Sequence, residues 1–116
     1  MAKKKPVSLT RELLLEKTKI EVVEAELDGE ILYIKPMSEV KRSTRASQAF
    51  TKDGEIDPKF MSVRRVYTII DHLCDSEGNY LFSEKDLRTL GDLDGAKLDR
   101  YFAAINSAIE KIEGNA

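Results

Sequence analysis

The acidic stretch at residues 75–86 carries the side chains of this sequence that come nearest to a metal site. Four oxygen-bearing residues hold ligand positions one, three, five and twelve of an EF-hand calcium loop: Asp75, Glu77, Asn79 and Asp86. That loop requires glycine at its sixth position, where this chain has Tyr80, and its last ligand is usually the longer glutamate. A turn with a left-handed bend at residues 78–79 and a helix cap at Ser83 explains the same residues. We therefore expect no metal here.

Asp71 and His72 are the remaining pair that could do acid–base chemistry. Neighbours in a helix diverge by about 100°, so these two side chains do not face each other. His72 is the only histidine, and we expect it at the boundary of the core or on the surface. Cys74 is the only cysteine, and it continues an apolar stripe, which favours a buried thiol. Because no nucleophile elbow, phosphate loop or dinucleotide motif occurs either, we expect a non-enzymatic protein without cofactors.

The composition and net charge of the chain indicate which kind of partner it binds. The chain has 116 residues, 41% hydrophobic and 34% charged, which fits one folded domain. Its net charge of -2 argues against nucleic acid as a partner, since phosphate binding usually needs a basic excess. The one basic cluster, around Lys41, Arg42, Arg45 and Lys52, is more consistent with a solvated helix face. No apolar run reaches the roughly 18 residues of a membrane span, so we expect a cytoplasmic protein with no membrane contact.

Residues 19–35 predict a β-hairpin. Asp28-Gly29 suits the positive φ angles of a type I′ turn, and it sets a register in which Val23 faces Ile34. One face should then meet the helices: Val23, Ala25, Leu27, Leu32 and Ile34. The other face is half apolar because it carries Val22, Ile31 and Tyr33. Two strands alone are marginal in water, so the hairpin should pair with a third strand, pack on helices or extend through a second subunit.

Helical patterns fill most of the remaining chain. We expect helices near residues 10–17, 38–50, 58–74, 83–91 and 96–113. The fold class is therefore α+β: a small hairpin or sheet near the N-terminus packed with four to five helices. Residues 1–8 should form a disordered basic tail, 9–113 a single domain and 114–116 a short tail. In the first helix Leu15 leans away from Leu9, Leu13 and Leu14, which either dock on the core or contact a partner.

The order of these features resembles one known family. The similarity comprises the leucine-rich leader at 9–14, strands at 21–24 and 31–35, a helix after Met37-Ser38, the run IIDHLCDSEGNYLFS at 69–83, and a closing helix with Leu98, Tyr101 and Phe102. In this order and spacing the chain resembles the tail assembly chaperones of long non-contractile-tailed bacteriophages. It departs from them at residues 41–58, which are more polar than the family's middle helix.

The resemblance implies a protein of the host cell cytoplasm that is absent from the mature virion. Such chaperones keep the tape measure protein soluble and help subunits of the major tail tube protein assemble around it. In many members a programmed frameshift adds an extension that recruits the tube protein. Glu113-Gly114-Asn115 can be encoded GAG-GGA-AAC, which contains a slippery heptamer. A gene that reads GAA or GGC at these codons would exclude that heptamer.

We expect exposed apolar side chains to make the partner contacts, since a chaperone must offer apolar surface to its client. The candidates are Leu15, Val22, Ile31 and Tyr33. Pairing of hairpin edges would allow a homo-oligomer. Two alternatives stay open: a tail-completion or connector protein of the virion, and a small nucleic-acid-associated regulatory domain that uses the lysines at 3–5 and the basic cluster.

Overall fold

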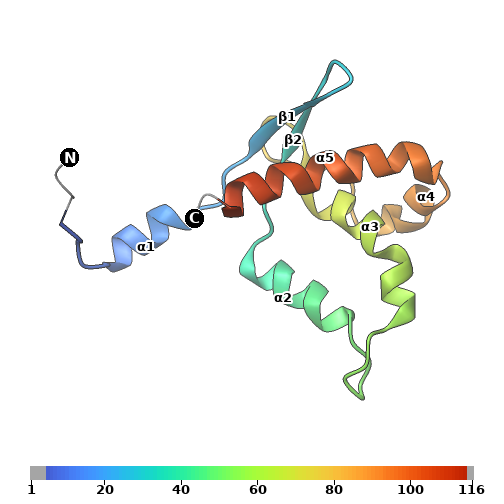
Figure 1. Cartoon of the computed structure of the whole chain (residues 1–116), viewed down its shortest axis with the longest axis horizontal. Helices are drawn as coiled ribbons and strands as arrows, with labels where there is room; N and C mark the ends of the chain where they lie inside the picture. Colours follow the sequence, from blue (N-terminus) through green and yellow to red (C-terminus); the bar gives the residue numbers. More distant parts are fainter. Residues whose placement is uncertain (1–4, 115–116) are drawn as a thin grey trace.

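The computed structural model describes residues 5–114, and it has the α+β layout that the sequence predicts. Five α-helices and a three-stranded antiparallel sheet lie within this range (Figure 1). The helices are α1 (Arg11–Lys17), α2 (Glu39–Gln48), α3 (Pro58–His72), α4 (Leu87–Gly91) and α5 (Gly95–Gly114), with one 3₁₀ turn, η1 (Glu84–Asp86). The strands are β1 (Val23–Leu27), β2 (Glu30–Ile34) and β3 (Leu73–Cys74). None of the described helices is long and apolar enough to cross a membrane.

The hairpin forms in the predicted register. Val23 lies opposite Ile34, and Leu27 lies opposite Glu30. Asp28 and Gly29 have φ angles of 53° and 82°, as a type I′ turn requires. Among the alternatives for completing the hairpin, the fold uses a third strand, because β3 pairs with β2. The strand order β1-β2-β3 leaves β1 at one edge of the sheet.

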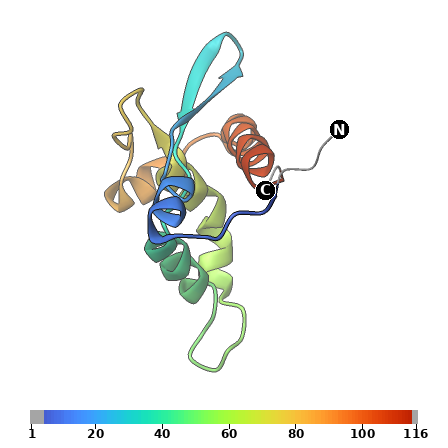
Figure 2. The ribbon, with the colours of Figure 1, turned by 90° about the vertical axis from the view of Figure 1, so that its left-hand side faces the viewer.

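The core lies between the inner face of the hairpin and two helices. α5 runs along β1 and packs on α3, so the sheet, α5 and α3 enclose the apolar side chains (Figures 1 and 2). Ile34, Ile69 and Ile105 are the largest completely buried residues, one each from β2, α3 and α5. The predicted inner face is confirmed, since its β2 residues are buried and its β1 residues pack against the cluster.

α3 begins where the sequence predicts but ends sooner. The Asp57 side chain accepts a hydrogen bond from the backbone N–H of Lys59, and Pro58 is the first helical residue. The predicted helix included Leu73 and Cys74, which is wrong, because these two residues form β3 and pair with Ile34 and Tyr33. Both residues are buried, so an apolar stripe could not distinguish the end of a helix from a short strand.

The acidic stretch forms the turn that the sequence predicts. Gly78 has a φ of 88°, and the Asp75 carboxylate accepts hydrogen bonds from the backbone N–H groups of Glu77 and Asn79 at 2.9 and 3.0 Å. These bonds, that to Asn79 foremost, hold the pKa of Asp75 below its ordinary value. Ser83 then begins η1, with its N–H donating to the Asp86 carboxylate at 2.8 Å.

α1 stands apart from the rest of the molecule (Figure 1). Thr10 caps it by accepting a hydrogen bond from the N–H of Leu13, but no residue of α1 is buried. Docking of α1 on its own core is therefore not observed. Residues 5–8 of the expected tail are exposed and form neither helix nor strand, whereas 1–4 lie outside the described residues. At the other end α5 includes Gly114, and 115–116 lie outside the described range.

Candidate interaction surfaces

Part of the basic cluster on α2 faces the body of the protein. The predicted solvated face is therefore wrong for Lys41 and Arg45, whereas Arg42 and Lys52 are exposed as predicted. Lys41, Arg45 and Ala49, spaced one helical turn apart, are partly buried, whereas Val40 is 77% exposed. α2 does not pack closely on α3. Long charged side chains span the distance instead, and they place the polar face of α2 inward.

Arg45 makes the main connection between α2 and α3. Its Nε and Nη2 donate to the two carboxylate oxygens of Asp71 at 2.8 and 2.9 Å. Asp71 is buried, with 3% of its side chain exposed, and 11% of the Arg45 side chain is exposed. Nη1 also donates to Glu84 at 2.9 Å, and the guanidinium lies 4.1 Å from the centre of the Tyr67 ring. These bonds, above all those to Asp71, raise the pKa of Arg45 above its already high value.

Lys41 adds a second connection. Its Nζ lies 3.8 Å from the centre of the Tyr80 ring, and Lys35 approaches the same ring at 4.9 Å. One signal in the sequence could have revealed the ion pair between Arg45 and Asp71. Asp71 falls within the buried run that ends α3, and a buried carboxylate needs a cationic partner.

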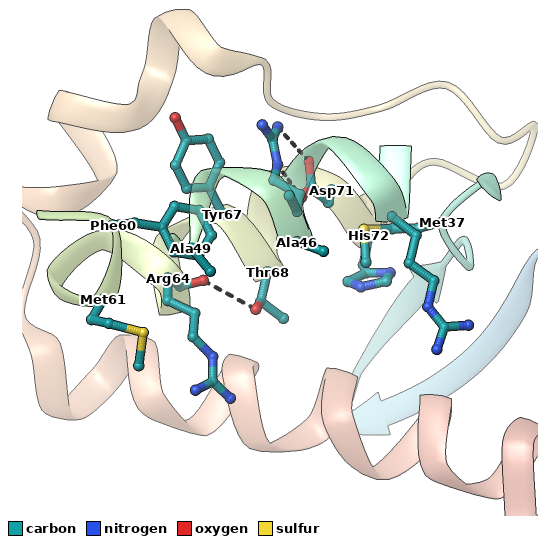
Figure 3. A pocket seen from close by; sticks show the side chains of 12 residues that line it. Met37, Ala46, Ala49, Phe60, Met61, Arg64, Tyr67, Thr68, Asp71 and His72 are labelled. Atoms are coloured by element: carbon teal, nitrogen blue, oxygen red, sulfur yellow. Dashed lines mark hydrogen bonds and ion pairs between the residues drawn. The ribbon is translucent and has the colours of Figure 1, made fainter. Parts of the chain in front are cut away.

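Between α2 and α3, beside the Arg45–Asp71 pair, lies a groove of about 370 Å³, the α2–α3 groove (Figure 3). Its lining is mostly apolar and comes from both helices and the loop before α2: Met37, Ala46, Ala49, Phe60, Met61 and Tyr67. Phe60 and Tyr67 stack with their ring centres 5.7 Å apart. Arg42 and Arg64 also border the groove, and both are exposed. The sequence did not predict this groove, because it arises from α2 being held at a distance from α3.

His72 is a core residue, which corrects the prediction of a boundary or surface position. Only 7% of it is exposed, and its Nδ1 lies 2.9 Å from the carbonyl oxygen of Lys35. Burial lowers the pKa of His72, and the positive charge of Lys41 lowers it further. The hydrogen bond to Lys35 and the negative charge of Asp71 act in the opposite direction. The imidazole is thus neutral at pH 7, with Nδ1–H donating to the carbonyl.

His72 should make stability depend on pH. Its pKa is lower in the folded chain than in the unfolded one, where it is about 6.5. The unfolded state therefore binds the proton more tightly, and the free energy of unfolding should fall as the pH drops from 7 to 5. Urea unfolding at several pH values measures this slope. His72→Asn retains a donor for Lys35 and should flatten the slope; an unchanged slope would exclude His72 as its source.

The predicted partner-binding residues do not form one patch. Val22, Ile31 and Tyr33 share the outer face of the hairpin, whereas Leu15 lies on the separate helix α1. Ile31 is 59% exposed, but Tyr33 and Val22 are half-buried. Val22 lies against the turn at Gly78, whose carbonyl accepts a hydrogen bond from Lys35. The turn thus covers the base of this face and leaves Ile31 as its most exposed apolar side chain.

A second groove, of about 560 Å³, runs between β1 and α5. Glu24 and Glu26 of the edge strand border it on one side, and small residues of α5, Ala104, Ser107 and Ala108, on the other. Charged residues on an edge strand disfavour pairing with another edge of the same kind. Edge-to-edge association of two hairpins would bring these glutamates together.

The remaining groups that could do chemistry are the metal-ligating side chains and the thiol. Between residues 5 and 114 no three histidine, cysteine, aspartate or glutamate side chains come together in a way that could hold a metal ion. Cys74 is buried, as predicted, and burial raises the pKa of its thiol, which keeps the sulfur protonated at pH 7. Comparison with protein-family models, curated proteins and solved structures gives no match.

Proposed function

We propose that this chain is a phage tail assembly chaperone, a non-enzymatic protein that binds the tape measure protein and keeps it soluble in the host cell cytoplasm. The proposal takes its client from the resemblance, carried most clearly by residues 69–83. A longer, frameshifted form would bring the major tail tube protein to the client, and neither form would remain in the mature virion.

The observation that supports a binding role is that α1 has no buried residue. An isolated helix of seven residues is marginal in water, because helix nucleation is costly and few bonds follow it. α1 nevertheless carries three consecutive leucines and buries none of them. Single exposed apolar residues are ordinary, but a helix with no packed side needs a partner. The chain therefore offers more apolar surface than its own fold uses.

The outer face of the hairpin is the proposed client contact. Ile31, with Tyr33 and Val22 beside it, offers a narrow apolar strip to the apolar side of a long helix, and Leu15 offers a second contact on α1. One such strip is small, so a single copy should bind weakly. Many copies along one long client gain by avidity, which suits a protein that coats its client.

Ile31→Asp should abolish client binding without unfolding the chaperone. The side chain is exposed, so the unfolding free energy should change by no more than about 0.5 kcal/mol, while a charge at the contact should lower client capture at least about tenfold. Pull-down with the tape measure protein measures capture. Ile56→Asp is the matched control, since Ile56 is also exposed but belongs to the loop between α2 and α3. That loop lies at the opposite end of the molecule from the hairpin (Figure 1). Equal capture by both variants would contradict this placement.

The rival functions differ in simple observations. A nucleic-acid-associated domain would bind DNA in a salt-sensitive manner. Lys41 and Arg45, which it would need, are instead occupied by Tyr80 and Asp71. A tail-completion or connector protein would be present in purified virions. Co-purification with a long helical protein at high salt, and absence from virions, supports the chaperone.

A further inference from the structure

The sheet has an open edge at β1. Within residues 5–114 this strand pairs with β2 alone. The residues that flank a two-residue hairpin turn exchange hydrogen bonds, so Leu27, Ala25 and Val23 direct their backbone groups toward β2. The backbone N–H and C=O groups of Glu24 and Glu26 alternate with these and point away from the sheet. No backbone hydrogen bond from outside the hairpin reaches them in the described part of the chain.

The groove of about 560 Å³ between β1 and α5 lies beside this edge. α5 runs along β1 (Figure 1), and its side of the groove carries small side chains: Ala104, Ser107 and Ala108, with Ile112 at one end. A strand that joins a sheet lies about 4.8 Å from its neighbour, and small side chains on the adjacent helix leave room for it. The groove therefore suits an extended segment beside β1.

Two acidic side chains determine which segment this edge accepts. Glu24 and Glu26 are exposed on the outer face of the hairpin, and within residues 5–114 neither belongs to an ion pair. Their cross-strand neighbours, Tyr33 and Ile31, carry no charge. Lysine or arginine opposite the two glutamates is favourable, whereas an acidic strand is repelled. Lys111 borders the groove on the α5 side, so the side chains directed toward α5 should be uncharged.

We propose that β1 binds an extended basic segment of another protein as an added strand, antiparallel like the other pairs of this sheet. Lysine or arginine of the segment lies opposite Glu24 and Glu26, and the small or apolar residues between them face α5. The backbone groups of both glutamates then bond to the segment. The same two charges exclude a second copy of the hairpin and admit a partner of opposite charge. The inference does not depend on the identity of the client.

A synthetic peptide of sequence Lys-Val-Lys-Thr-Lys-Val-Lys, with acetyl and amide ends, tests this contact on the full chain. Fluorescence anisotropy of the labelled peptide should show saturable binding. The amide protons of Glu24 and Glu26 should exchange at least about tenfold more slowly in the complex, because they become hydrogen-bonded. No binding at millimolar peptide, or protection that spares these two amides, would overturn the proposal.

Two N-methylated forms of the peptide distinguish strand pairing from simple charge attraction. In the proposed pairing the N–H groups of the lysines point toward β1, and those of the valines and threonine point away. Methylation of the lysine backbone nitrogens should weaken binding at least about tenfold, and methylation of the others should change it by less than about threefold. Equal affinity of the two forms would overturn the addition of a strand.

Charge reversal on the protein tests the same edge from the other side. Glu24→Lys/Glu26→Lys should weaken binding of the unmodified peptide at least about tenfold, while the circular dichroism spectrum stays that of the folded chain. Glu12→Lys/Glu16→Lys is the matched control, because it makes the same change of net charge at exposed positions of α1. The control should bind within about twofold of the wild-type chain. An equal loss in both variants would contradict binding at β1.

Discussion

Arg45→Ala is expected to lower the free energy of unfolding by about 3–5 kcal/mol, because it leaves the Asp71 carboxylate buried without its partner. The effect exceeds that of a surface ion pair, which is usually worth about 0–1 kcal/mol. The same substitution should release α2, whose main connection to α3 is this side chain. Urea unfolding measures the first effect, and faster amide exchange within α2 measures the second.

Most of this loss in the free energy of unfolding arises from the unpaired charge of Asp71. A double substitution distinguishes that cost from the stability that the ion pair itself contributes. Arg45→Met/Asp71→Leu removes both charges and should recover most of the lost stability. Arg88→Ala, an exposed arginine on α4, is the matched control and should change stability by no more than about 0.5 kcal/mol. A loss below about 1 kcal/mol for Arg45→Ala would mean that α2 is held by other contacts.

Ile34→Ala should cost about 2–5 kcal/mol, because the side chain is completely buried between the sheet and the helices and its removal leaves a cavity. Ile31→Ala, on the opposite face of the same strand, should cost no more than about 0.5 kcal/mol. Thermal or urea unfolding of the two variants measures the difference.

This comparison also tests the hairpin register. A shift of one residue would exchange the two faces, so Ile31→Ala would become the costly substitution. Equal losses for both variants would mean that the outer face is covered in solution. The free energy of unfolding of the wild-type chain should be measured at several protein concentrations, since association between copies adds stability that depends on concentration.

The sequence predicted the parts of the fold that local patterns determine. Asp28-Gly29 specifies a turn whose two residues need positive φ, and that turn sets the pairing of Val23 with Ile34. The helices near residues 10 and 38 begin after Thr10 and Ser38, whose side chains accept hydrogen bonds from backbone N–H groups, and Gly78 marks the turn after β3. Each of these features depends on residues within a few positions of one another.

The features that the sequence did not predict depend on contacts between distant residues. Arg45 and Asp71 are 26 positions apart, so nothing local shows that the basic face of α2 turns inward. Leu73 and Cys74 form a strand rather than the end of a helix because they pair with β2. His72 is a core residue that hydrogen-bonds to the carbonyl of Lys35. The candidate binding residues also show which features local patterns predict.

Val22, Ile31 and Tyr33 share a face of the hairpin because strand alternation requires it. The sequence did not predict that Leu15 lies far from them, nor that α2 and α3 form a groove.

Co-expression with the proposed client, the tape measure protein whose gene we expect beside that of this chain, tests the proposed function most directly. The measurement is the soluble fraction of the tape measure protein with this chain, with its Ile31→Asp variant, and alone. We expect a soluble complex with many copies of the wild-type chain, and an insoluble tape measure protein in the other two cases. A tape measure protein that remains insoluble beside the folded wild-type chain would contradict the chaperone function.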